Sequence, residues 1–382
     1  MNSTIVASGV TSQPTSITVA WSDGTAGEFA SVWLRDNLPE DRDQHSGQRL
    51  VDVMDIPAAP RVRSASLTDR VLDVDWMDEP RRSSFDLRWL YEYATGGQVR
   101  PELQTRLWLE GAARTPQRDF GWLTFERFQS DARTRLAWLT RLLQDGIAFL
   151  SDVPRRNHAI LEATAQIGYV PETNYGRVFD VRAVPQPENL AYSDLGLGLH
   201  TDNPYREPVP GFQALHTMLA APDGGDSLFA DGFAIAEHLR ETQSEAFATI
   251  CATPVPFFYQ APGVDLYAER PLIELNCAGV VAAVTYNNRA VGPLHLQAAQ
   301  CPAYYAAYRK FAALLREPRL QMATRLKDGD LAVFDNRRIL HGRTGFASAQ
   351  HPRHLQGCYL TRDSVYSETA VLRKQLDEGG AK

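Results

Sequence analysis

The sequence predicts a mainly β protein with flanking helices, built from a small β-rich N-terminal domain and a larger domain with a jelly-roll fold. Short strand-like runs separated by Gly and Pro turns fill most of the chain beyond Tyr169, and a second set of such runs precedes residue 96. A few amphipathic helices interrupt the strands, and helices outside many short strands favour a two-sheet jelly roll over a parallel α/β sheet. The length of 382 residues also exceeds the usual range for one domain.

The N-terminal domain is expected to cover residues 1–95. The run ITVAWSDGTAGEFASVWL (17–34) predicts two strands around an Asp-Gly turn, and RVLDVDWMDEPRRSSFDLRWL (70–90) alternates apolar and polar positions as a half-buried strand does. Residues 96–120 are polar and rich in turn-forming residues, so they are expected to be a linker. The larger domain is then expected to span 121–382.

The helices of the larger domain are predicted from their apolar spacing. Phe, Leu and Trp at three- and four-residue intervals predict one amphipathic helix over 125–146, where a glycine ends it. Residues 147–154 follow as a buried strand and 159–168 as a second helix. Two further helices are expected at about 229–250 and 302–316.

The composition excludes several classes of partner. A formal net charge of −7 argues against nucleic acid or an acidic membrane surface, because both attract basic proteins. The N-terminus lacks the features of a signal peptide, and no window approaches 18 apolar residues, so a cytoplasmic protein is expected. The scattered cysteines form no CxxC pair, which fits a reducing compartment; they are Cys251, Cys277, Cys301 and Cys358.

The segment GLHTDNPYREPVPG (198–211) places two metal-binding residue types, His200 and Asp202, two positions apart. Side chains at i and i+2 of an extended segment point to the same side, so this pair could share a metal ion. A mononuclear iron centre uses two histidines and one carboxylate and leaves three coordination positions open. His341, in the strand-like run 329–346, is the candidate for the second histidine. An HxD triplet alone is weak evidence, and a single strand histidine is more often structural.

Two further residues strengthen the iron hypothesis. Ser227, in the turn GGDS, follows His200 by 27 positions, and Arg353 follows His341 by 12. An arginine and a hydroxyl can together hold the far carboxylate of a 2-oxoacid, because a guanidinium matches a carboxylate with two hydrogen bonds. These parts therefore predict an iron site with a 2-oxoacid cosubstrate.

Residues 160–366, which contain these five residues, resemble the Fe(II)/2-oxoglutarate oxygenases of the taurine dioxygenase superfamily. Within it, they are most similar to the gamma-butyrobetaine and trimethyllysine hydroxylase branch. The resemblance extends into the N-terminal domain and implies a double-stranded β-helix and a homodimer. The motifs that carry it are SVWLRDN, HTDNPYREPVPGFQALHT, GGDSLFADGF, VFDNRRILHGRTGF and RHLQGCYLTRD.

The resemblance also implies the cofactors and the reaction. It makes His200, Asp202 and His341 the ligands of Fe(II). It makes 2-oxoglutarate the cosubstrate, with its far carboxylate held by Arg353 and Ser227. The implied reaction uses O2 to hydroxylate an unactivated carbon and releases succinate and CO2, so the iron performs the difficult chemical step.

Aromatic residues indicate a substrate with a trimethylammonium group. Such a group offers no hydrogen-bond donor and is recognised by cation–π contact in an aromatic cage. By resemblance, Tyr175, Phe179, Tyr192 and Tyr359 match the cage of gamma-butyrobetaine hydroxylases. Phe179 departs from the tryptophan of that type. Without the resemblance, aromatic residues in a jelly roll would be assigned to the core.

Three residues bear on the anionic end of the substrate. Asn189 and Asn288 match the branch's carboxylate-binding asparagines, whereas Arg289 has no counterpart in the gamma-butyrobetaine type. A phosphonate carries up to two negative charges and would gain from a guanidinium. Arg289 therefore favours 2-(trimethylammonio)ethylphosphonate as the substrate. The alternative role of this side chain is an exposed arginine or an ion pair.

Three other functions stay open from the sequence. The first is a gamma-butyrobetaine hydroxylase that forms carnitine, and the second is a taurine-type dioxygenase of a small acid. The third is a noncatalytic jelly roll that binds a metal or a small molecule. A zinc hydrolase with the same triad would leave Arg353 and the GGDS hydroxyl without a task.

The N-terminal domain departs from the gamma-butyrobetaine type in one respect. That type holds a zinc ion with three cysteines and a histidine after the WLRDN motif. Here the matching positions carry residues that do not bind zinc in this way, and structural zinc requires four N or S ligands. No structural zinc is therefore expected, and the domain should be stabilised by packing. The four positions are Leu38, Glu40, Asp43 and Pro80.

Overall fold

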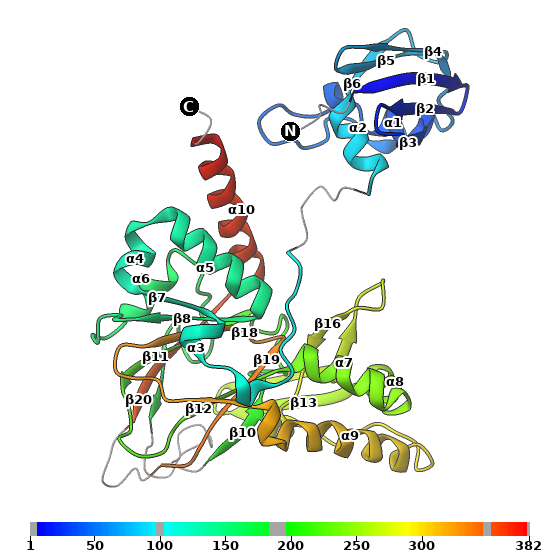
Figure 1. Cartoon of the computed structure of the whole chain (residues 1–382). Helices are drawn as coiled ribbons and strands as arrows, with labels where there is room; N and C mark the ends of the chain where they lie inside the picture. Colours follow the sequence, from blue (N-terminus) through cyan, green and yellow to red (C-terminus); the bar gives the residue numbers. More distant parts are fainter. Residues whose placement is uncertain (1–5, 97–102, 183–195, 347–352, 380–382) are drawn as a thin grey trace. The chain divides into compact units, whose positions relative to one another are not determined.

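The chain divides into two compact units, Met1–Glu102 and Leu103–Lys382 (Figure 1). No helix in the described part of the chain is long and apolar enough to cross a membrane. The computed structural model describes residues 6–96, 103–182, 196–346 and 353–379.

The N-terminal unit repeats one pattern twice, because each of its two antiparallel three-stranded sheets is followed by a helix. The expected strands in 17–34 and 70–90 are confirmed, and the last residues of both runs begin helices. The first repeat contains β1 (Ala7–Gln13), β2 (Ser16–Trp21), β3 (Ala26–Ala30) and α1 (Ser31–Asp36). The second contains β4 (Val62–Thr68), β5 (Val71–Trp76), β6 (Arg82–Asp86) and α2 (Leu87–Ala94), and η1 (Pro39–Asp41) and η2 (Val53–Asp55) lie between the repeats.

The central strands of the two sheets bury alternate residues. Ile17 and Val19 of β2 are fully buried, as are Leu72 and Val74 of β5. A tryptophan ends each strand on the same buried face. This period of two explains why the strands were predictable, since one face of each sheet packs on a core and the other meets water.

A buried arginine joins the loop after α1 to the β5–β6 hairpin. Arg35 is 3% exposed, donates to Asp41 at 2.7 Å and forms a two-bond pair with Glu79, in which one contact is 3.0 Å. Arg81 adds a second pair to Asp41 at 3.0 Å. Leu38, at a position where the gamma-butyrobetaine type has a cysteine, is fully buried. Buried charges thus accompany the apolar packing of this loop.

Replacing Arg35 with methionine is expected to destabilise the N-terminal unit by about 1–3 kcal/mol, because Asp41 and Glu79 would lose a partly buried partner. Hydrogen exchange of the loop after α1, in the full chain, measures the effect. The matched control is Arg49→Met, since Arg49 is 46% exposed and pairs with Asp36. Equal protection in both variants would show that the buried network contributes nothing.

The larger unit is a jelly roll of two facing sheets, a double-stranded β-helix. Phe149 and Phe334 of one sheet contact Phe229 of the other with ring centroids 6.1 and 5.5 Å apart. Among the residues that the structure describes, all strand pairs of this unit are antiparallel except β7 with β8. In spatial order, the first sheet contains β7 (Gly121–Thr124), β8 (Ile147–Ser151), β18 (Leu331–Asp335), β11 (Phe212–Leu219), β20 (His354–Leu360) and β9 (Phe179–Arg182). The second contains β10 (Leu197–His200), β19 (Ile339–Arg343), β12 (Ser227–Asp231) and β17 (Met322–Thr324).

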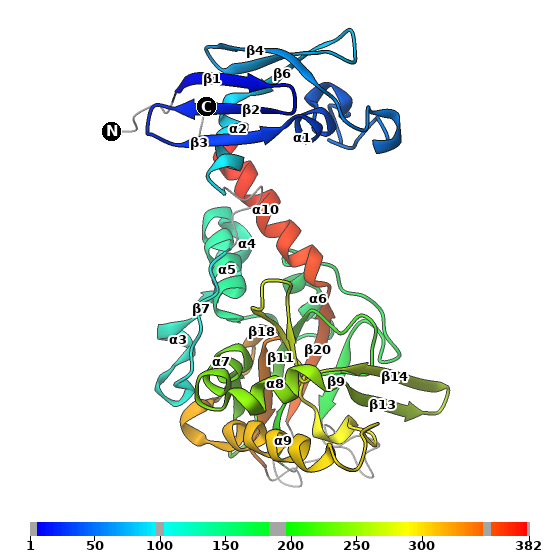
Figure 2. The same ribbon diagram turned by 90° about the vertical axis from the view of Figure 1, so that its right-hand side faces the viewer.

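Helices cover both sheets from outside (Figures 1 and 2). One group packs on the six-stranded sheet and the other on the four-stranded sheet, each through its own apolar cluster. The first group contains α4 (Phe125–Ser130), α5 (Ala132–Asp145), α6 (Ala159–Thr164) and α10 (Arg362–Gly379), and the second α7 (Gly232–Thr242), α8 (Ser244–Ala252) and α9 (Cys301–Arg316). The remaining elements are α3 (Pro116–Asp119), β13 (Val255–Ala261), β14 (Val264–Arg270), β15 (Ile273–Leu275), β16 (Val281–Val284), η3 (Gly111–Ala113), η5 (Asn288–Ala290) and η6 (Pro318–Leu320).

Two predicted helices differ from the structure. The helix expected over 125–146 is two helices, because the Asp131 carboxylate accepts the first amide hydrogens of α5 and interrupts the run. The helix expected over 229–250 begins as strand β12, and Asp231 then caps α7 in the same way. The end of the first run is confirmed at Gly146, which has a positive φ of 78°.

The linker expected over 96–120 also differs from the structure. Its second half belongs to the larger unit, where Trp108 is 3% exposed and donates from Nε1 to the carbonyl of Asp145 at 2.9 Å. The carbonyl of Arg106 accepts a bond from Arg338 at 2.7 Å. The polar composition concealed one buried tryptophan and two backbone contacts that hold this segment in place.

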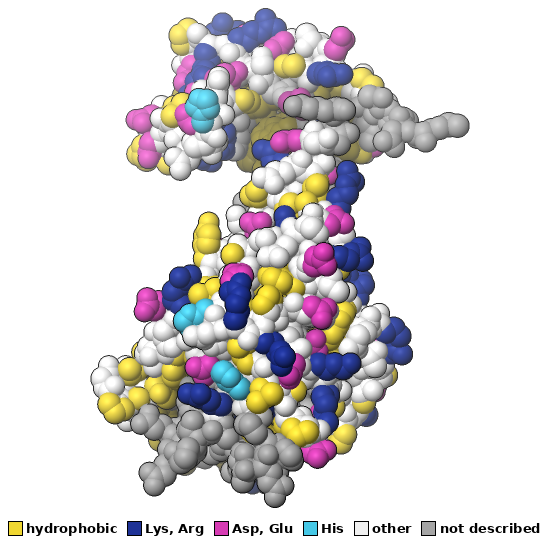
Figure 3. Space-filling view, turned by 90° about the vertical axis from the view of Figure 1, so that its left-hand side faces the viewer, with side chains coloured by type: hydrophobic (Ala, Val, Ile, Leu, Met, Phe, Trp, Pro, Cys, Tyr) yellow, Lys and Arg dark blue, Asp and Glu magenta, His cyan; other side chains and the backbone are white. Residues whose placement is uncertain are grey.

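Charges of both signs are interspersed on the surface. Figure 3 shows Lys and Arg side chains among Asp and Glu on one face. Many of the arginines pair with carboxylates, such as Arg155 with Asp328 and Arg319 with Glu110. Exposed pairs of this kind stabilise a fold by about 0–1 kcal/mol each, so they contribute more to solubility than to stability.

Candidate metal centre and its pocket

Strand pairing brings the two predicted histidines together. His200 of β10 lies directly opposite His341 of β19, and their ring centroids are 4.3 Å apart. Asp202 follows β10, and its backbone is fixed by Asn336 in the turn before β19. The Asn336 side chain accepts from the Asp202 amide at 2.7 Å and donates to the Asp202 carbonyl at 3.0 Å. The structure thus assembles the predicted triad from segments 140 residues apart.

The donor atoms of the triad converge as metal ligands do. One donor atom from each of His200, Asp202 and His341 lies within 4.8 Å of the others. His200 Nδ1 lies 2.9 Å from the carbonyl of Gly198, which can only accept, so Nδ1 carries the proton. The other ring nitrogen, His200 Nε2, lies 3.3 Å from Asp202 Oδ1. An imidazole nitrogen and a carboxylate oxygen at this separation can share one metal ion, and this set of nitrogen and oxygen donors suits Fe(II).

Protonation also favours metal binding. Burial would raise the pKa of Asp202, but His200 and His341 outweigh burial and hold that pKa well below its usual range. Burial and the neighbouring His200 lower the pKa of His341 to about 3. The triad therefore offers a carboxylate and a neutral imidazole at physiological pH, the forms in which these groups bind metals.

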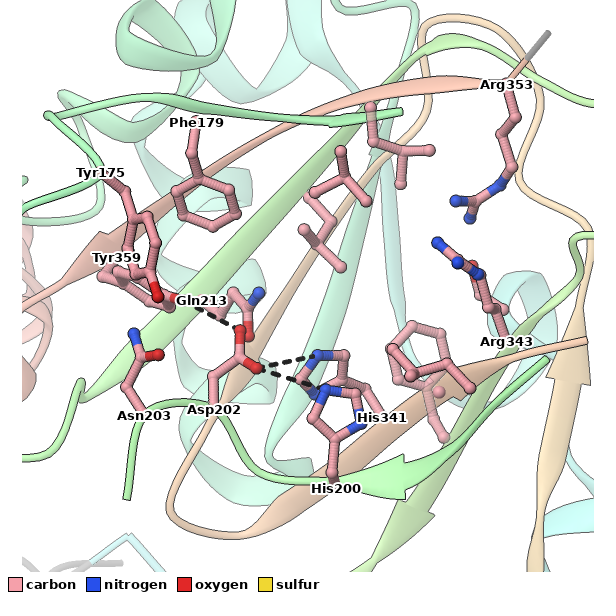
Figure 4. Close-up of a pocket in the computed structure, with 17 residues that line it drawn as sticks. Tyr175, Phe179, His200, Asp202, Asn203, Gln213, His341, Arg343, Arg353 and Tyr359 are labelled. Atoms are coloured by element: carbon pink, nitrogen blue, oxygen red, sulfur yellow. Dashed lines mark hydrogen bonds and ion pairs between the residues drawn. The ribbon is translucent and has the colours of Figure 1, made fainter. Parts of the chain in front are cut away.

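Two arginines converge at one end of the pocket (Figure 4). Arg353, just before β20, is 8% exposed, and Arg343, the last residue of β19, is 5% exposed. Ser227, opposite Arg343 in the sheet, lines the same end. Burial and the charge of Arg343 lower the pKa of Arg353 to about 10, which still leaves it charged near neutral pH. Two buried guanidinium groups make this end a site for an anion such as a carboxylate.

The GGDS turn makes room for this arginine. Gly224 and Gly225 both have a φ of +68°, which side chains other than glycine rarely adopt. A Cβ on Gly225 would lie 3.0 Å from Arg353 Cδ. The glycines thus allow the backbone to pass close to the guanidinium while Ser227 faces the pocket.

Aromatic side chains line the opposite end of the pocket (Figure 4). The Phe179 ring lies 5.1 Å from Tyr359 and 6.3 Å from Tyr175. Tyr259 extends the group at 6.0 Å from Tyr175 and stacks on Tyr205 at 5.1 Å. Three of the four predicted cage residues are therefore together. The fourth, Tyr192, lies outside the described residues, as does Asn189.

The structure does not bring Asn288 and Arg289 into the pocket lining. Both are exposed in η5, and Asn288 Oδ1 accepts a bond from the Tyr308 hydroxyl at 2.7 Å. Reduced solvation lowers the pKa of Arg289, and the negative charge of Asp202 opposes this shift. Because Asp202 affects its pKa, the Arg289 guanidinium lies within electrostatic reach of the triad. Asn288 thus has another partner, and the role of Arg289 stays a prediction.

Sequence reasoning missed several pocket residues. Arg343 carried a usable signal, because it lies two positions after His341 on one strand and points to the same face. Asn203 and Gln213 are buried and line the pocket, and each has one side-chain atom without a partner among the described residues. Tyr259 carried no signal, because its hairpin reaches the aromatic end only through the fold.

A jelly roll with a two-histidine, one-carboxylate triad defines the class of mononuclear non-haem iron oxygenases. Residues 114–359 match the model of the taurine catabolism dioxygenase TauD, TfdA family, and residues 9–91 match a gamma-butyrobetaine hydroxylase-like N-terminal domain. The chain belongs to this family and is a 2-oxoglutarate-dependent dioxygenase.

Named relatives match along nearly their whole length. A gamma-butyrobetaine dioxygenase from Pseudomonas sp. (strain AK-1) is 35% identical, with 94% of each chain covered. The human protein of that name is 28% identical, covering 94% of this chain and 95% of its own. A mitochondrial trimethyllysine dioxygenase from Mus musculus is 28% identical, covering 91% of this chain and 84% of its own. The chain is therefore similar both to gamma-butyrobetaine dioxygenases and to a trimethyllysine dioxygenase.

Proposed function

We propose that this dioxygenase hydroxylates a small trimethylammonium zwitterion at an unactivated CH2 group, with 2-(trimethylammonio)ethylphosphonate as the favoured substrate. The observation that carries the proposal is the polarity of the pocket (Figure 4). An arginine pair lies at one end, aromatic rings at the other, and the triad between them. This order supports separate places for an anionic cosubstrate and a cationic substrate group.

The triad and the arginine end account for the cosubstrate. His200, Asp202 and His341 would hold Fe(II), which with 2-oxoglutarate and O2 supplies the oxidant and releases succinate and CO2. Arg353 binds the far carboxylate of 2-oxoglutarate, and the Ser227 hydroxyl donates to it. The low exposure of both residues excludes water and so strengthens this charge-assisted contact.

The aromatic end supports a cationic substrate group. Cation–π contact contributes about 0.5–2 kcal/mol at a ring face. The hydroxyl of Tyr175 lies 3.3 Å from that of Tyr205, and the hydroxyl of Tyr359 donates to Asp202 at 2.9 Å. Because these hydroxyls have partners, the ring faces and Phe179 remain to contact methyl groups. The Asp202 carboxylate adds attraction for a positive charge nearby.

Arg289 supports a phosphonate as the other substrate group. Its guanidinium is close enough to Asp202 for that carboxylate to affect its pKa. A phosphonate, with up to two charges, gains more from a guanidinium than a single carboxylate does.

Replacing Arg289 with alanine is expected to lower kcat/KM for the phosphonate by about 10-fold, or ~1.4 kcal/mol, and to change gamma-butyrobetaine turnover much less. The ratio of the two values in one preparation corrects for differences in iron loading. An unchanged ratio would remove Arg289 from substrate selection.

Gamma-butyrobetaine is the second candidate substrate, because the 35% identical bacterial relative is named for it. Succinate release should be measured with the phosphonate, gamma-butyrobetaine, trimethyllysine and taurine in parallel. We expect the highest kcat/KM with the phosphonate. Preference for gamma-butyrobetaine would select the second candidate, and turnover of taurine alone would contradict a cage for a cation.

A further inference from the structure

The two oxygens of Asp202 face different partners (Figure 4). Oδ1 lies 3.3 Å from His200 Nε2 and 3.9 Å from His341 Nε2, on the side of the metal ligands. Oδ2 accepts a hydrogen bond from the Tyr359 hydroxyl at 2.9 Å. A phenol that donates to a carboxylate forms a charge-assisted hydrogen bond, which is about twice as strong as a neutral one.

Both partners of this hydrogen bond are held rigidly. Tyr359 is 5% exposed on strand β20, between β11 and β9, and its ring packs against Phe179. Asn336 fixes the backbone of Asp202 from both sides. Asp202 is therefore held at its backbone by Asn336 and at Oδ2 by the Tyr359 hydroxyl.

We propose that Tyr359 is a positioning residue whose hydroxyl holds Oδ2 of Asp202 away from the metal, so that Oδ1 alone is offered as a ligand. A two-oxygen carboxylate and two histidines would fill four of six coordination positions. A chelating 2-oxoacid would then fill the remaining two and leave none for O2. The hydroxyl thus keeps one position open, while the ring is a wall of the aromatic end. The first role rests on the triad, and the second rests on the proposed function.

Tyr175 provides a matched comparison. Its ring lines the same end of the pocket, but its hydroxyl lies 3.3 Å from the Tyr205 hydroxyl, which donates to Asn203 Oδ1 at 2.7 Å. Tyr175→Phe and Tyr359→Phe each remove one phenolic oxygen and keep a ring. Only Tyr359→Phe frees an oxygen of a metal ligand.

The test is an anaerobic titration of the apoprotein with Co(II), whose visible absorption reports the number and geometry of its ligands. We expect Tyr359→Phe to weaken Co(II) binding by about 10–100-fold and to change the absorption, whereas Tyr175→Phe stays close to the wild type. Affinity for 2-(trimethylammonio)ethylphosphonate, measured by calorimetry, should change less than about 3-fold in both variants, because the rings remain. Tyr359→Leu, which also lacks the ring, should lose both affinities.

The outcomes separate the two roles of Tyr359. Wild-type Co(II) affinity and absorption in Tyr359→Phe would overturn the proposal, as would equal losses in the two phenylalanine variants. Melting temperatures of the apoproteins show whether each variant is folded. If Tyr359→Phe does not fold, the Co(II) affinity of Tyr359→Leu tests the proposal in its place. If the wild type binds neither the phosphonate nor gamma-butyrobetaine, the proposed substrate class fails. The Co(II) comparison would still decide the role of the hydroxyl.

Discussion

The His341→Ala protein is expected to lose Fe(II) affinity by more than about 100-fold and turnover by about 1,000-fold. His341 provides one of three converging donors, and its low pKa keeps the imidazole free of a competing proton. Alanine would leave only His200 and Asp202, and two ligands are too few both to bind the metal tightly and to fix its geometry. Iron content after equilibrium dialysis and succinate release measure the two losses separately.

His216 supplies the control for this substitution. It is also fully buried, lies on β11 and is outside the triad. The His216→Ala protein should lose stability, because it gains a cavity, but should keep its iron. Loss of iron in both variants would mean that any buried histidine matters equally, and the triad would then not be the metal site.

The fold makes the centre through pairing of distant segments. Strands β10 and β19 place two histidines side by side, and the turn before β19 supplies the asparagine that fixes the backbone of Asp202. One strand thus links the metal centre to the arginine end of the pocket, because β19 carries His341 and, two residues later, Arg343. A small shift of β19 would disturb the metal and the anion site together.

The parts of the site that follow a short period were predictable from the sequence. The pairing of His200 with Asp202 follows from the alternation of side chains in an extended segment. The N-terminal strands were predictable because one face of each sheet is buried. The split at Asp131 was not predictable from apolar spacing, because the same spacing continues across a capping aspartate. The boundary between β12 and α7 was not predictable for the same reason, because Asp231 both ends the strand and caps the helix.

Contacts between distant segments account for the other differences. The linker prediction relied on polarity, but one tryptophan, Trp108, fixes that segment to the larger unit. The Arg35 network joins residues 44 positions apart and has no local pattern. Resemblance named Asn288, but its amide oxygen also accepts a hydrogen bond from the hydroxyl of Tyr308, 20 positions away. Such pairings depend on tertiary structure, which residue type and spacing do not determine.

Replacing Arg353 with methionine is expected to raise KM for 2-oxoglutarate by about 30-fold or more, because removal of one partner of a buried charge pair costs about 2–5 kcal/mol. The same change is expected to stabilise the apoprotein. Arg353 is buried beside Arg343, and its pKa is lowered to about 10 from 12.5. The folded state therefore binds this proton less tightly than the unfolded chain does. The resulting penalty applies below about pH 10 and disappears as the pH rises through the range between these two pKa values.

Methionine keeps much of the arginine volume and removes the charge, so unfolding of the apoprotein at pH 7 should require about 1–3 kcal/mol more free energy. Thermal unfolding with and without 2-oxoglutarate distinguishes the two effects. The ligand should raise the melting temperature of the wild type by mass action and leave that of Arg353→Met nearly unchanged. A variant that is less stable without ligand yet still stabilised by it would assign Arg353 to the fold rather than to the cosubstrate. A variant that is more stable without ligand and is not stabilised by 2-oxoglutarate would show that Arg353 lowers the stability of the apoprotein and binds the anion.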